Sequence, residues 1–241
     1  MNALLLAAGF GTRLLPLTQK IPKCLVPICD KPLLEYWLDM LCFDDEIDNV
    51  YINTHYLPNQ VQSFVKTYKN PKKIILCHET KLLGTAGTLK NLVKKLSSDS
   101  LFFAHADNLS VFDMKSFKLA FAKRPRYCEI TMMVFETDNP TSCGIVQFNG
   151  DGVITGFEEK PQKPKSNLAN GAVYILSREA IKSIGNNTLG DDFSTEIIPE
   201  FLKKINIWQN TEYHRDVGNI LSLTQARSDM KKLLKTIKSS K

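Results

Sequence analysis

The stretch Ala3-Leu-Leu-Leu-Ala-Ala-Gly-Phe-Gly-Thr-Arg13 decides the fold of this 241-residue chain. Its apolar half predicts a buried strand, which breaks at Gly9 into a Gly-x-Gly turn. Glycines let the backbone turn tightly and bring bare N–H groups close to anionic oxygens. Thr12 adds a hydroxyl donor, and Arg13 adds a planar guanidinium that can bind two oxygens at once. The stretch therefore predicts a strand followed by a phosphate-binding loop.

The loop differs from the two common phosphate-binding motifs. The dinucleotide-binding fingerprint needs a third glycine where this chain has Leu14, and the Walker motif needs a Gly-Lys-Ser/Thr sequence that this segment lacks. A plain tight turn would also explain the two glycines. A turn has no need of cations, however, and both Arg13 and Lys23 lie close to it in the sequence. These two side chains favour phosphate binding.

The composition is typical of a folded α/β protein and argues against several classes of function. Apolar residues make up 43% of the chain, which is enough for a sizeable core. A net charge of +6 without a dense basic stripe favours small anionic substrates over nucleic acid. No apolar run approaches the roughly 20 residues of a membrane span, and the glycine loop begins too early for a leader peptide. The six cysteines show neither a Cys-x-x-Cys pair nor zinc spacing, so we expect free thiols in the cytoplasm.

The hydrophobic pattern predicts an α/β fold. In the first half, strands at 3–8, 50–53, 74–77 and 101–104 alternate with helices at 33–42, 59–68, 86–96 and 113–122. The second half has predicted strands at 129–136, 144–148, 153–159 and 173–176, and helices near 195–204 and over 219–237. The sequence Asn-Gly-Asp-Gly at 149–152 predicts a hairpin turn. The pattern favours a mixed, mostly parallel sheet flanked by helices, with residues 1–241 as a single domain.

Two acids follow or precede regular elements in the way expected of metal ligands. Asp107 comes after the predicted strand at 101–104, and Asp216 comes just before the last helix. Ligands of open α/β sheets lie beyond the carboxyl ends of the strands, and Mg²⁺ takes one or two protein carboxylates together with phosphate oxygens and water. Each acid could instead cap a helix or stabilise a turn. The sequence alone does not show whether the two carboxylates meet.

Two further segments carry residues that could bind a substrate. Lys160 follows the strand pattern at 153–159 and precedes a proline, which fixes the direction of its cation. Glu159 could hydrogen-bond the hydroxyls of a polyol, although a solvated surface charge cluster gives the same pattern. Gly84 and Thr85 open a predicted helix, whose backbone N–H groups could face an anion or a base. A simple helix start, with Thr85 as its N-cap, is the alternative.

In their order along the chain, these motifs resemble the sugar-phosphate nucleotidyltransferase family, the enzymes that make nucleotide-diphosphate sugars. The matching segments are 6–13 with Leu17 and Thr18, 22–27, 83–87, Asp107, 157–161, 170–174 and 216–218. The Pro-Lys-x-Leu-Val-Pro form at 22–27 looks more like the mannose- or heptose-phosphate guanylyltransferases than like the thymidylyl type. Many longer members carry a C-terminal β-helix, which we do not expect in this chain.

The resemblance implies a Rossmann-like mixed, mostly parallel sheet and a division of labour along one domain. Residues 1–125 would form the nucleotide-binding half and residues 126–241 the sugar-phosphate-binding half. The nucleotide would be bound by Leu6, Ala8, Gly9, Gly11, Thr12, Arg13, Lys23, Glu79, Gly84, Thr85 and Asp107. The sugar phosphate would be bound by Gly144, Glu159, Lys160, Asn170 and Gly171, and Mg²⁺ by Asp107 and Asp216. Catalysis would be carried by Arg13, Lys23, Asp107, Lys160 and Asp216.

The implied reaction is attack of a sugar 1-phosphate oxygen on the α-phosphorus of a nucleoside triphosphate, with pyrophosphate as the leaving group. Both reactants are anionic, so the cations and Mg²⁺ would offset their repulsion. A carboxylate at Glu79 only accepts hydrogen bonds, which favours guanine, with its two adjacent donors, and hence GTP with a mannose- or heptose-type sugar. The alternatives are UTP or dTTP as donor, CTP with a phospho-alcohol acceptor, and a non-catalytic nucleotide-binding subunit. A homo-oligomer is compatible with the sequence, which leaves the oligomeric state open.

Overall fold

Two units, each assembled from separate segments of the sequence, make up the fold. The computed structural model describes residues 1–70, 73–93, 95–96, 98–186 and 190–239. The loop unit contains Leu5–Leu82, His105–Val111 and Tyr213–Lys241, and the sheet unit contains Met1–Leu4, Leu83–Ala104 and Phe112–Glu212. Position 94 of the helix predicted over 86–96 lies outside the described residues.

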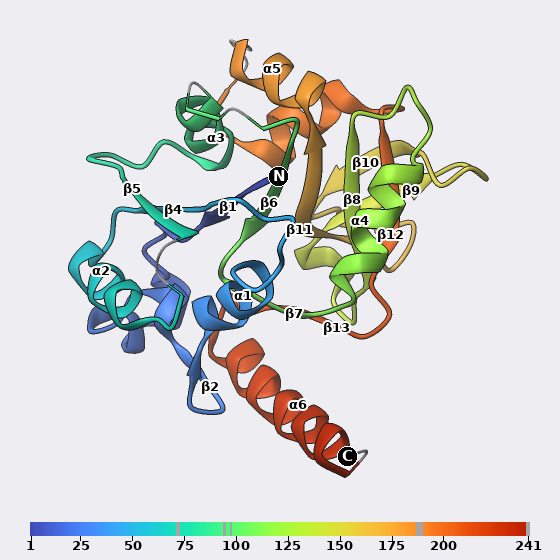
Figure 1. The fold of residues 1–241 in the computed structure, drawn as a ribbon. Helices are drawn as coiled ribbons and strands as arrows, with labels where there is room; N and C mark the ends of the chain where they lie inside the picture. The colour runs from blue at the N-terminus through green and yellow to red at the C-terminus, as the bar shows by residue number, and fades with distance from the viewer. Residues whose placement is uncertain (71–72, 94, 97, 187–189, 240–241) are drawn as a thin grey trace. The chain divides into compact units, whose positions relative to one another are not determined.

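The loop unit contains a parallel strand pair joined through a helix. Strand β4 (Val50–Thr54) pairs in parallel with β5 (Ile74–His78), and α2 (Pro58–Thr67) lies between them in the chain. Figure 1 shows α2 running alongside the two strands. Parallel strands need such a crossover connection, which is usually a helix. The predicted strands and helix of this segment are confirmed.

Helix α1 (Leu33–Leu41) carries the core of the loop unit. Its buried residues are Leu33, Leu34, Trp37, Leu38 and Leu41, which recur every three or four positions and so share one face. One cluster of the core joins segments that are far apart in the sequence: Leu14, Val26, Ile28, Leu33, Leu109, Val217, Leu223, Ala226 and Met230. The last three belong to α6 (Ile220–Ser239), which leads to the C-terminus in Figure 1. This packing ties the segment after the glycine loop to the end of the chain.

Two short antiparallel strand pairs also belong to the described part of the loop unit. Strand β2 (Pro27–Ile28) pairs with β3 (Lys31–Pro32), and β7 (Asn108–Val111) pairs with β13 (Tyr213–Asp216), both antiparallel. The sequence analysis did not predict these strands, because segments of two to four residues are too short to show a period. The β7–β13 pairing matters most for function, since it brings together two segments about a hundred residues apart.

The sheet unit is built around one long strand, β11 (Leu168–Ser177). It pairs antiparallel with β6 (Ser100–His105), β8 (Ile130–Glu136) and β9 (Gly144–Phe148). β10 (Ile154–Glu159) pairs antiparallel with β9, and β12 (Ile205–Gln209) pairs in parallel with β8. Parallel and antiparallel pairings therefore occur together. The first strand of the chain, β1 (Asn2–Leu6), has its first residues in this unit and its last two in the loop unit.

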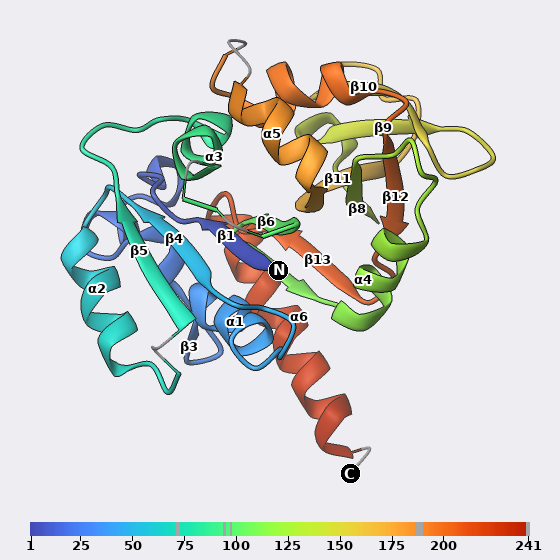
Figure 2. The same cartoon turned by 45° about the horizontal axis from the view of Figure 1, so that its top comes forward.

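Three α-helices lie in the described part of the sheet unit. They are α3 (Thr85–Val93), α4 (Met114–Lys123) and α5 (Arg178–Asn186). Figure 2 shows α3 and α5 lying side by side, and α4 packs on β8. Helix α5 was not predicted, although it buries Ala180, Ile181 and Ile184 on one face. Its short apolar pattern has only two and a half turns in which to repeat.

Two turns refine the sequence-based expectations. The hairpin turn predicted at 149–152 is confirmed, because it joins β9 to β10 and Asn149 Oδ1 accepts bonds from the backbone N atoms of Asp151 and Val153. The helix predicted near 195–204 is wrong as a regular helix. Phe193–Ile197 forms a π-helical turn and Ile198–Phe201 a 3-10 turn. A proline at position 199 removes an N–H donor that an α-helix would need.

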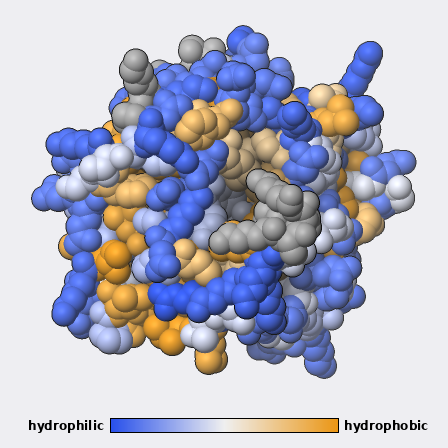
Figure 3. All heavy atoms as spheres, turned by 60° about the horizontal axis from the view of Figure 1, so that its bottom comes forward, coloured by the Kyte–Doolittle hydropathy of each residue, from blue (hydrophilic) through white to orange (hydrophobic). Residues whose placement is uncertain are grey.

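The surface is mixed in character. On the face drawn in Figure 3, hydrophilic residues (blue) are interspersed with smaller apolar groups (orange). Exposed large apolar side chains include Phe43, Leu119, Tyr127 and Leu221, which belong to different elements. Such scattered exposure is ordinary for a folded protein. Within the described residues, no helix combines the length and the apolar character that crossing a membrane requires.

Candidate active site

The glycine-rich stretch leaves β1 after Leu6 and forms an exposed loop. Gly11 has φ 65° and ψ 33°, in the left-handed region that favours glycine, and it precedes a 3-10 turn over Thr12–Leu14. A Cβ at Gly11 would lie 3.0 Å from the Cβ of Lys23, whereas a Cβ at Gly9 would meet nothing within 4 Å. The backbone at Gly9 is therefore open to the approach of a ligand.

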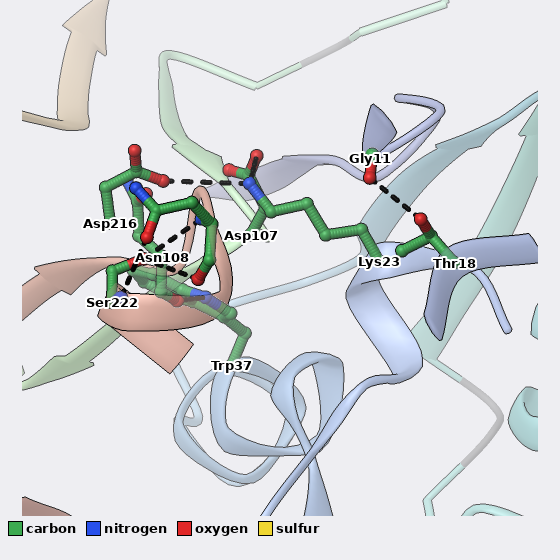
Figure 4. Close-up of polar contacts among 9 residues, drawn as sticks. Gly11, Thr18, Lys23, Trp37, Asp107, Asn108, Asp216 and Ser222 are labelled. Carbon is green, nitrogen blue, oxygen red and sulfur yellow. Dashed lines mark hydrogen bonds and ion pairs between the residues drawn. The ribbon is translucent and has the colours of Figure 1, made fainter. Parts of the chain in front are cut away.

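Neighbouring side chains brace the loop. The Thr18 hydroxyl donates to the carbonyl oxygen of Gly11 at 2.8 Å, as Figure 4 shows, and the Tyr56 hydroxyl donates to the carbonyl of Thr18 at 2.8 Å. The exposed ring of Phe10 meets the rings of His55 and Tyr56 edge-on, with centroids 5.5 and 5.4 Å away. The loop is thus held by the segment that follows β4.

Lys23 stands between two carboxylates in Figure 4. Its Nζ lies 2.6 Å from Oδ2 of Asp107 and 3.6 Å from Oδ1 of Asp216. The Lys23 side chain is only 7% exposed, while those of Asp107 and Asp216 are 34% and 53% exposed. The structure therefore brings together the two acids that the sequence singled out as metal ligands, and it places the second predicted cation between them.

Strand pairing explains why the two acids meet. Asp216 ends β13 and pairs with Asn108, the residue that follows Asp107. The backbone N of Val217 also donates to the carbonyl of Asp107 at 3.3 Å. The Asn108 carbonyl in turn accepts a bond from the indole nitrogen of Trp37 at 2.9 Å, which anchors this end of the β7–β13 strand pair to α1. The carboxylates are thus carried by a fixed backbone.

Arg13 lies beside the same cluster. A Cβ built on Gly218 would be 2.6 Å from Oδ2 of Asp216 and 3.2 Å from Nη1 of Arg13. Gly218 thus leaves room for a carboxylate and a guanidinium at one place. Four of the five predicted catalytic residues gather in the loop unit: Arg13, Lys23, Asp107 and Asp216.

The carboxylates of the cluster differ in their electrostatics. Burial raises the pKa of Asp107, but the charges of Lys23 and His105 and the bond from Lys23 outweigh it, so the pKa lies below its ordinary value. Burial and the negative charge of Asp107 raise the pKa of Asp216 instead. Burial lowers the pKa of His214, also on β13, to about 3, so this imidazole is neutral near pH 7. The charges of Lys23 and Arg13 act on the pKa of Asp216 in the opposite direction but do not outweigh its rise.

This donor set fits Mg²⁺. The two carboxylates of Asp107 and Asp216 face a common point, which the Lys23 ammonium marks. Within the described part of the chain, no group of three or more His, Cys, Asp and Glu side chains is arranged around one point. Two carboxylates are what Mg²⁺ takes from a protein when phosphate oxygens and water fill its other positions. The chemistry of these ligands therefore suits a hard cation that arrives with a phosphate.

The remaining predicted nucleotide-binding residues have structural partners. Leu6 accepts a bond from the N of Ala106 at 3.0 Å, and Ala8 is buried. Glu79 is also buried, and its Oε1 accepts a bond from Nδ2 of Asn53 at 3.0 Å. Its role at the base stays a prediction. The bond from Asn53 is a contact of the Glu79 carboxylate that the sequence did not indicate.

Gly84 and Thr85 lie in the sheet unit, at the start of α3. The backbone N of Ala86 donates to the carbonyl of Asp191 at 2.8 Å, and the Thr85 hydroxyl oxygen accepts from the N of Phe193 at 2.6 Å. Gly84 has φ 78°, and a Cβ there would lie 2.4 Å from the same Asp191 carbonyl. The helix start is thus packed against the segment at 190–193, a contact that the sequence analysis did not foresee.

The predicted sugar-phosphate residues gather on neighbouring strands of the sheet unit. Gly144 on β9 pairs with Glu159 on β10, and a Cβ on Gly144 would lie 2.8 Å from Oε2 of Glu159. Lys160 has φ 49° and its Nζ lies 3.4 Å from Oε1 of Glu159. A non-glycine residue in the left-handed region is uncommon and tends to occur at functional sites. The Lys160 conformation is consistent with the role predicted for it.

Asn170 and Gly171 continue this group on β11. Asn170 Oδ1 accepts from the N of Ala172 at 2.9 Å, and its Nδ2 donates to the hydroxyl of buried Tyr174 at 2.7 Å. A Cβ on Gly171 would lie 3.2 Å from the carbonyl oxygen of Met133, so the backbones approach closely there. Ala169 pairs with Ile145, which sets Asn170 next to the Gly144 end of β9. The structure thus brings together all five predicted sugar-phosphate residues.

Sequence reasoning missed the residues that support the loop. Asn53 looked like the last residue of an apolar strand, and Tyr56 like a loop residue. Asn53 Oδ1 accepts from the N of Ala7 at 2.7 Å, which is where the glycine loop begins. A polar residue at the carboxyl end of an otherwise apolar strand was the available signal, because that end of an α/β sheet carries the ligands.

Comparison with known proteins identifies the family of this chain. The sequence matches the Nucleotidyl transferase family over residues 2–232. The mannose-1-phosphate guanylyltransferase catalytic subunit beta of Drosophila melanogaster is 30% identical over 223 residues, which are 90% of this chain and 59% of that protein. The bifunctional protein GlmU of Methanocaldococcus jannaschii is 28% identical over 94% of this chain and 53% of that protein. The chain spans about half the length of the curated relatives that it matches.

Solved structures share the fold over nearly the whole chain. HddC from Yersinia pseudotuberculosis, complexed with GMP-PN, has a TM-score of 0.77 at 23% identity and covers 95% of this chain and 99% of its own. A UDP-glucose pyrophosphorylase complexed with UDP-glucose also has a TM-score of 0.77, at 20% identity, with 96% and 98% covered. The predicted fold class, a Rossmann-like mixed sheet flanked by helices, is confirmed. The fold and the family match together establish that this chain belongs to the nucleotidyl transferase family.

Proposed function

We propose that this chain transfers a nucleoside monophosphate from a nucleoside triphosphate to a sugar 1-phosphate, with release of pyrophosphate. The observation that carries the proposal is the position of Lys23, whose Nζ lies 2.6 and 3.6 Å from the carboxylates of Asp107 and Asp216 and whose Cβ packs against Gly11 of the glycine loop. Such a combination of cations, carboxylates and open backbone suits a triphosphate bound with a metal ion. The names of the relatives, guanylyltransferases and GlmU, support the same class of reaction.

The reaction needs alignment and charge stabilisation more than proton transfer. The attacking phosphate oxygen is already ionised, so no general base is required. Arg13 and Lys23 would bind the triphosphate and offset the repulsion between the two anionic reactants, while Lys160 would bind the sugar phosphate. Holding the oxygen in line with the α-phosphorus would supply much of the remaining rate enhancement.

Asp107 and Asp216 would hold Mg²⁺. When bound, the ion would neutralise charge on the α-phosphoryl oxygens and help orient the triphosphate. Lys23 would then share the site with the metal, and its contact with Asp107 would keep that carboxylate ionised and directed toward the phosphates. Glu159, Asn170 and the Gly144 backbone would orient the sugar.

GTP is the donor that we propose, with a mannose- or heptose-type sugar 1-phosphate as acceptor. The guanylyltransferase relatives support this choice, among them an Arabidopsis thaliana mannose-1-phosphate guanylyltransferase 1 that is 34% identical over 76% of this chain. We also propose that the protein acts in the cytoplasm. Its six cysteines are free thiols, as a reducing compartment favours.

A matrix of substrates tests the proposal. The full chain is incubated with Mg²⁺, each of GTP, UTP, dTTP, CTP and ATP, and a panel of sugar 1-phosphates together with phosphocholine, and pyrophosphate release is measured. We expect the highest kcat/KM with GTP and mannose 1-phosphate or a heptose 1-phosphate, and no release when Mg²⁺ is chelated. Preference for UTP or dTTP, or for CTP with phosphocholine, would replace the proposed substrates. Nucleotide binding without pyrophosphate release in any pair would make the chain a non-catalytic subunit.

A further inference from the structure

Asn53 links the start of the glycine loop to Glu79 through both ends of its side-chain amide. Its Oδ1 accepts from the backbone N of Ala7 at 2.7 Å, and its Nδ2 donates to Oε1 of Glu79 at 3.0 Å. Asn53, Glu79 and Ala7 are 4%, 5% and 8% exposed. The orientation of the amide follows from chemistry, because a backbone N–H only donates, so the amide oxygen must face Ala7 and the amide nitrogen faces Glu79.

Glu79 is itself fixed by the backbone around it. Its N donates to the carbonyl of Thr54 at 2.8 Å, and its carbonyl oxygen lies 2.8 Å from Nδ1 of His55. Asn53 and Thr54 end β4, and Glu79 directly follows β5, so the parallel pairing of these strands sets the distance between the amide and the carboxylate. The link from Ala7 to Glu79 therefore rests on a rigid part of the loop unit.

The link matters because Ala7 lies only two positions before Gly9, where the exposed part of the loop begins. We propose that Asn53 is a positioning residue, which fixes where the phosphate-binding loop leaves β1, and that Glu79 sets the orientation of the Asn53 amide. This inference rests on the proposed function, since the loop is taken to bind a triphosphate. A loop shifted by a fraction of an ångström would present its N–H groups at the wrong distance from the phosphates.

Reversing the direction of one hydrogen bond tests the proposal. Asn53→Asp keeps an acceptor for Ala7 but sets a second carboxylate against Glu79, and the two like charges repel. Adding Glu79→Gln restores a donor, because the Gln amide can donate to one oxygen of the new Asp while the other accepts from Ala7. The double variant thus rebuilds the link with opposite polarity. KM for GTP in the double variant reports separately on Glu79, because that KM stays raised if the Glu79 carboxylate binds the base even when the link is rebuilt.

We measure two kinds of quantity on the full chain. The first is the steady-state kinetics, which give kcat, KM for GTP and KM for the sugar 1-phosphate, and the second is the exchange rate of the Ala7 amide proton. We expect Asn53→Asp to raise KM for GTP about tenfold or more, to leave KM for the sugar phosphate within about twofold, and to speed Ala7 exchange. Asn53→Asp with Glu79→Gln should return the Ala7 exchange rate to within about threefold of the native chain, and this rate decides the rescue because Glu79 is also predicted to bind the base. A defect in overall folding would change both KM values alike and would not be rescued.

Asn70→Asp is the matched control, because the Asn70 amide also donates to a carbonyl in the loop unit, that of Cys42 at 2.9 Å, away from the glycine loop. It should leave both KM values unchanged. Native behaviour of Asn53→Asp, or failure of Ala7 exchange to recover in the double variant, would overturn the proposal. If the native chain releases no pyrophosphate, the proposed function falls, while Ala7 exchange in the same variants still decides the positioning role.

Discussion

Lys23 packs its Cβ against the backbone of Gly11, so closely that a methyl group added to Gly11 would lie only 3.0 Å from it. The same methyl would lie 3.0 Å from Cγ2 of Thr18. Gly11 also has a left-handed backbone, with φ 65°. The backbone of Gly11 is therefore packed directly against the base of the side chain whose cation is proposed to meet the phosphates.

Gly11→Ala should lower both stability and activity, whereas Gly9→Ala should lower activity alone. An alanine at Gly11 is strained by its backbone conformation and by its neighbours, and we expect a loss of about 1–2 kcal/mol of unfolding free energy. A Cβ at Gly9 would have no protein atom within 4 Å, so it would contact only a bound phosphate. Urea denaturation and KM for GTP measure the two effects. Native KM in Gly9→Ala would mean that the phosphates do not approach this backbone.

Lys23→Met should increase the rise in melting temperature that Mg²⁺ causes, and it should lower turnover. Removing the ammonium leaves the carboxylates of Asp107 and Asp216 facing each other without their shared cation. We expect turnover to fall at least about tenfold, and Mg²⁺ to raise the melting temperature of the variant more than that of the native chain. The matched control combines Lys23→Met with Asp107→Asn, which removes a ligand and should cancel the extra rise. An equal Mg²⁺ effect in all three proteins would place the metal elsewhere.

Asp107→Asn and Arg13→Ala should each lower turnover at least about tenfold, because each removes one charge from the phosphate site. Arg13 is exposed, so its replacement should leave the melting temperature nearly unchanged. Asp113→Asn serves as the control, since Asp113 caps α4 in the sheet unit with a bond to the N of Lys115, which an asparagine can also accept. Turnover near the native value in both site variants would refute the assigned roles.

Periodicity was enough for some elements and failed for others of the same length. The α1 pattern repeats over nine residues, and β9 has the predicted bounds. Strand β12 was missed because its pairing with β8, which lies seventy residues earlier in the chain, decides its conformation. The π-helical turn at Phe193–Ile197 likewise depends on its packing and on the proline that follows. Local sequence does not contain this information.

The residues of the candidate site also fall into those that the sequence predicted and those that it did not. The motif residues Arg13, Lys23, Asp107 and Asp216 could be predicted because charged side chains beside a glycine loop or a strand end have few structural uses. Their supports could not, since the Ala7–Asn53–Glu79 link and the β7–β13 pairing join residues 26 to 108 positions apart. An asparagine that ends a buried strand becomes recognisable only when the register of the neighbouring strand is known.

Asp39→Asn should lower stability at neutral pH but not in acid. Asp39 on α1 accepts bonds from Lys31, from Lys69 at 2.9 Å and from the Tyr68 hydroxyl at 2.9 Å. Burial raises the pKa of Asp39, but these partners outweigh it and hold the pKa below its ordinary value. A carboxyl with a lowered pKa in the folded state stabilises the protein above its unfolded pKa, and this contribution is lost as the pH falls through the folded value.

We therefore expect Asp39→Asn to cost about 1 kcal/mol of unfolding free energy at pH 7, since the lysines are partly exposed. The difference from the native chain should begin to shrink below about pH 4, where the unfolded carboxyl takes up its proton. Urea denaturation at several pH values measures it. Asp45→Asn, at an exposed position in the same unit, is the control and should change little. A difference that grew in acid would contradict the sign of the pKa shift.

Gly144→Ala should weaken binding of the sugar phosphate and spare the nucleotide. The new Cβ would lie 2.4 Å from Cζ of Phe157 and 2.8 Å from Oε2 of Glu159, and both atoms are the ends of side chains that can move. The strain is then relieved by displacing Glu159, which the proposed function assigns to the sugar hydroxyls. We expect KM for the sugar 1-phosphate to rise about tenfold and KM for GTP to stay within about twofold. Gly150→Ala, in the turn after β9 with nothing within 4 Å, should change neither value. Equal rises in both KM values would show that the sheet unit does not bind the sugar phosphate separately.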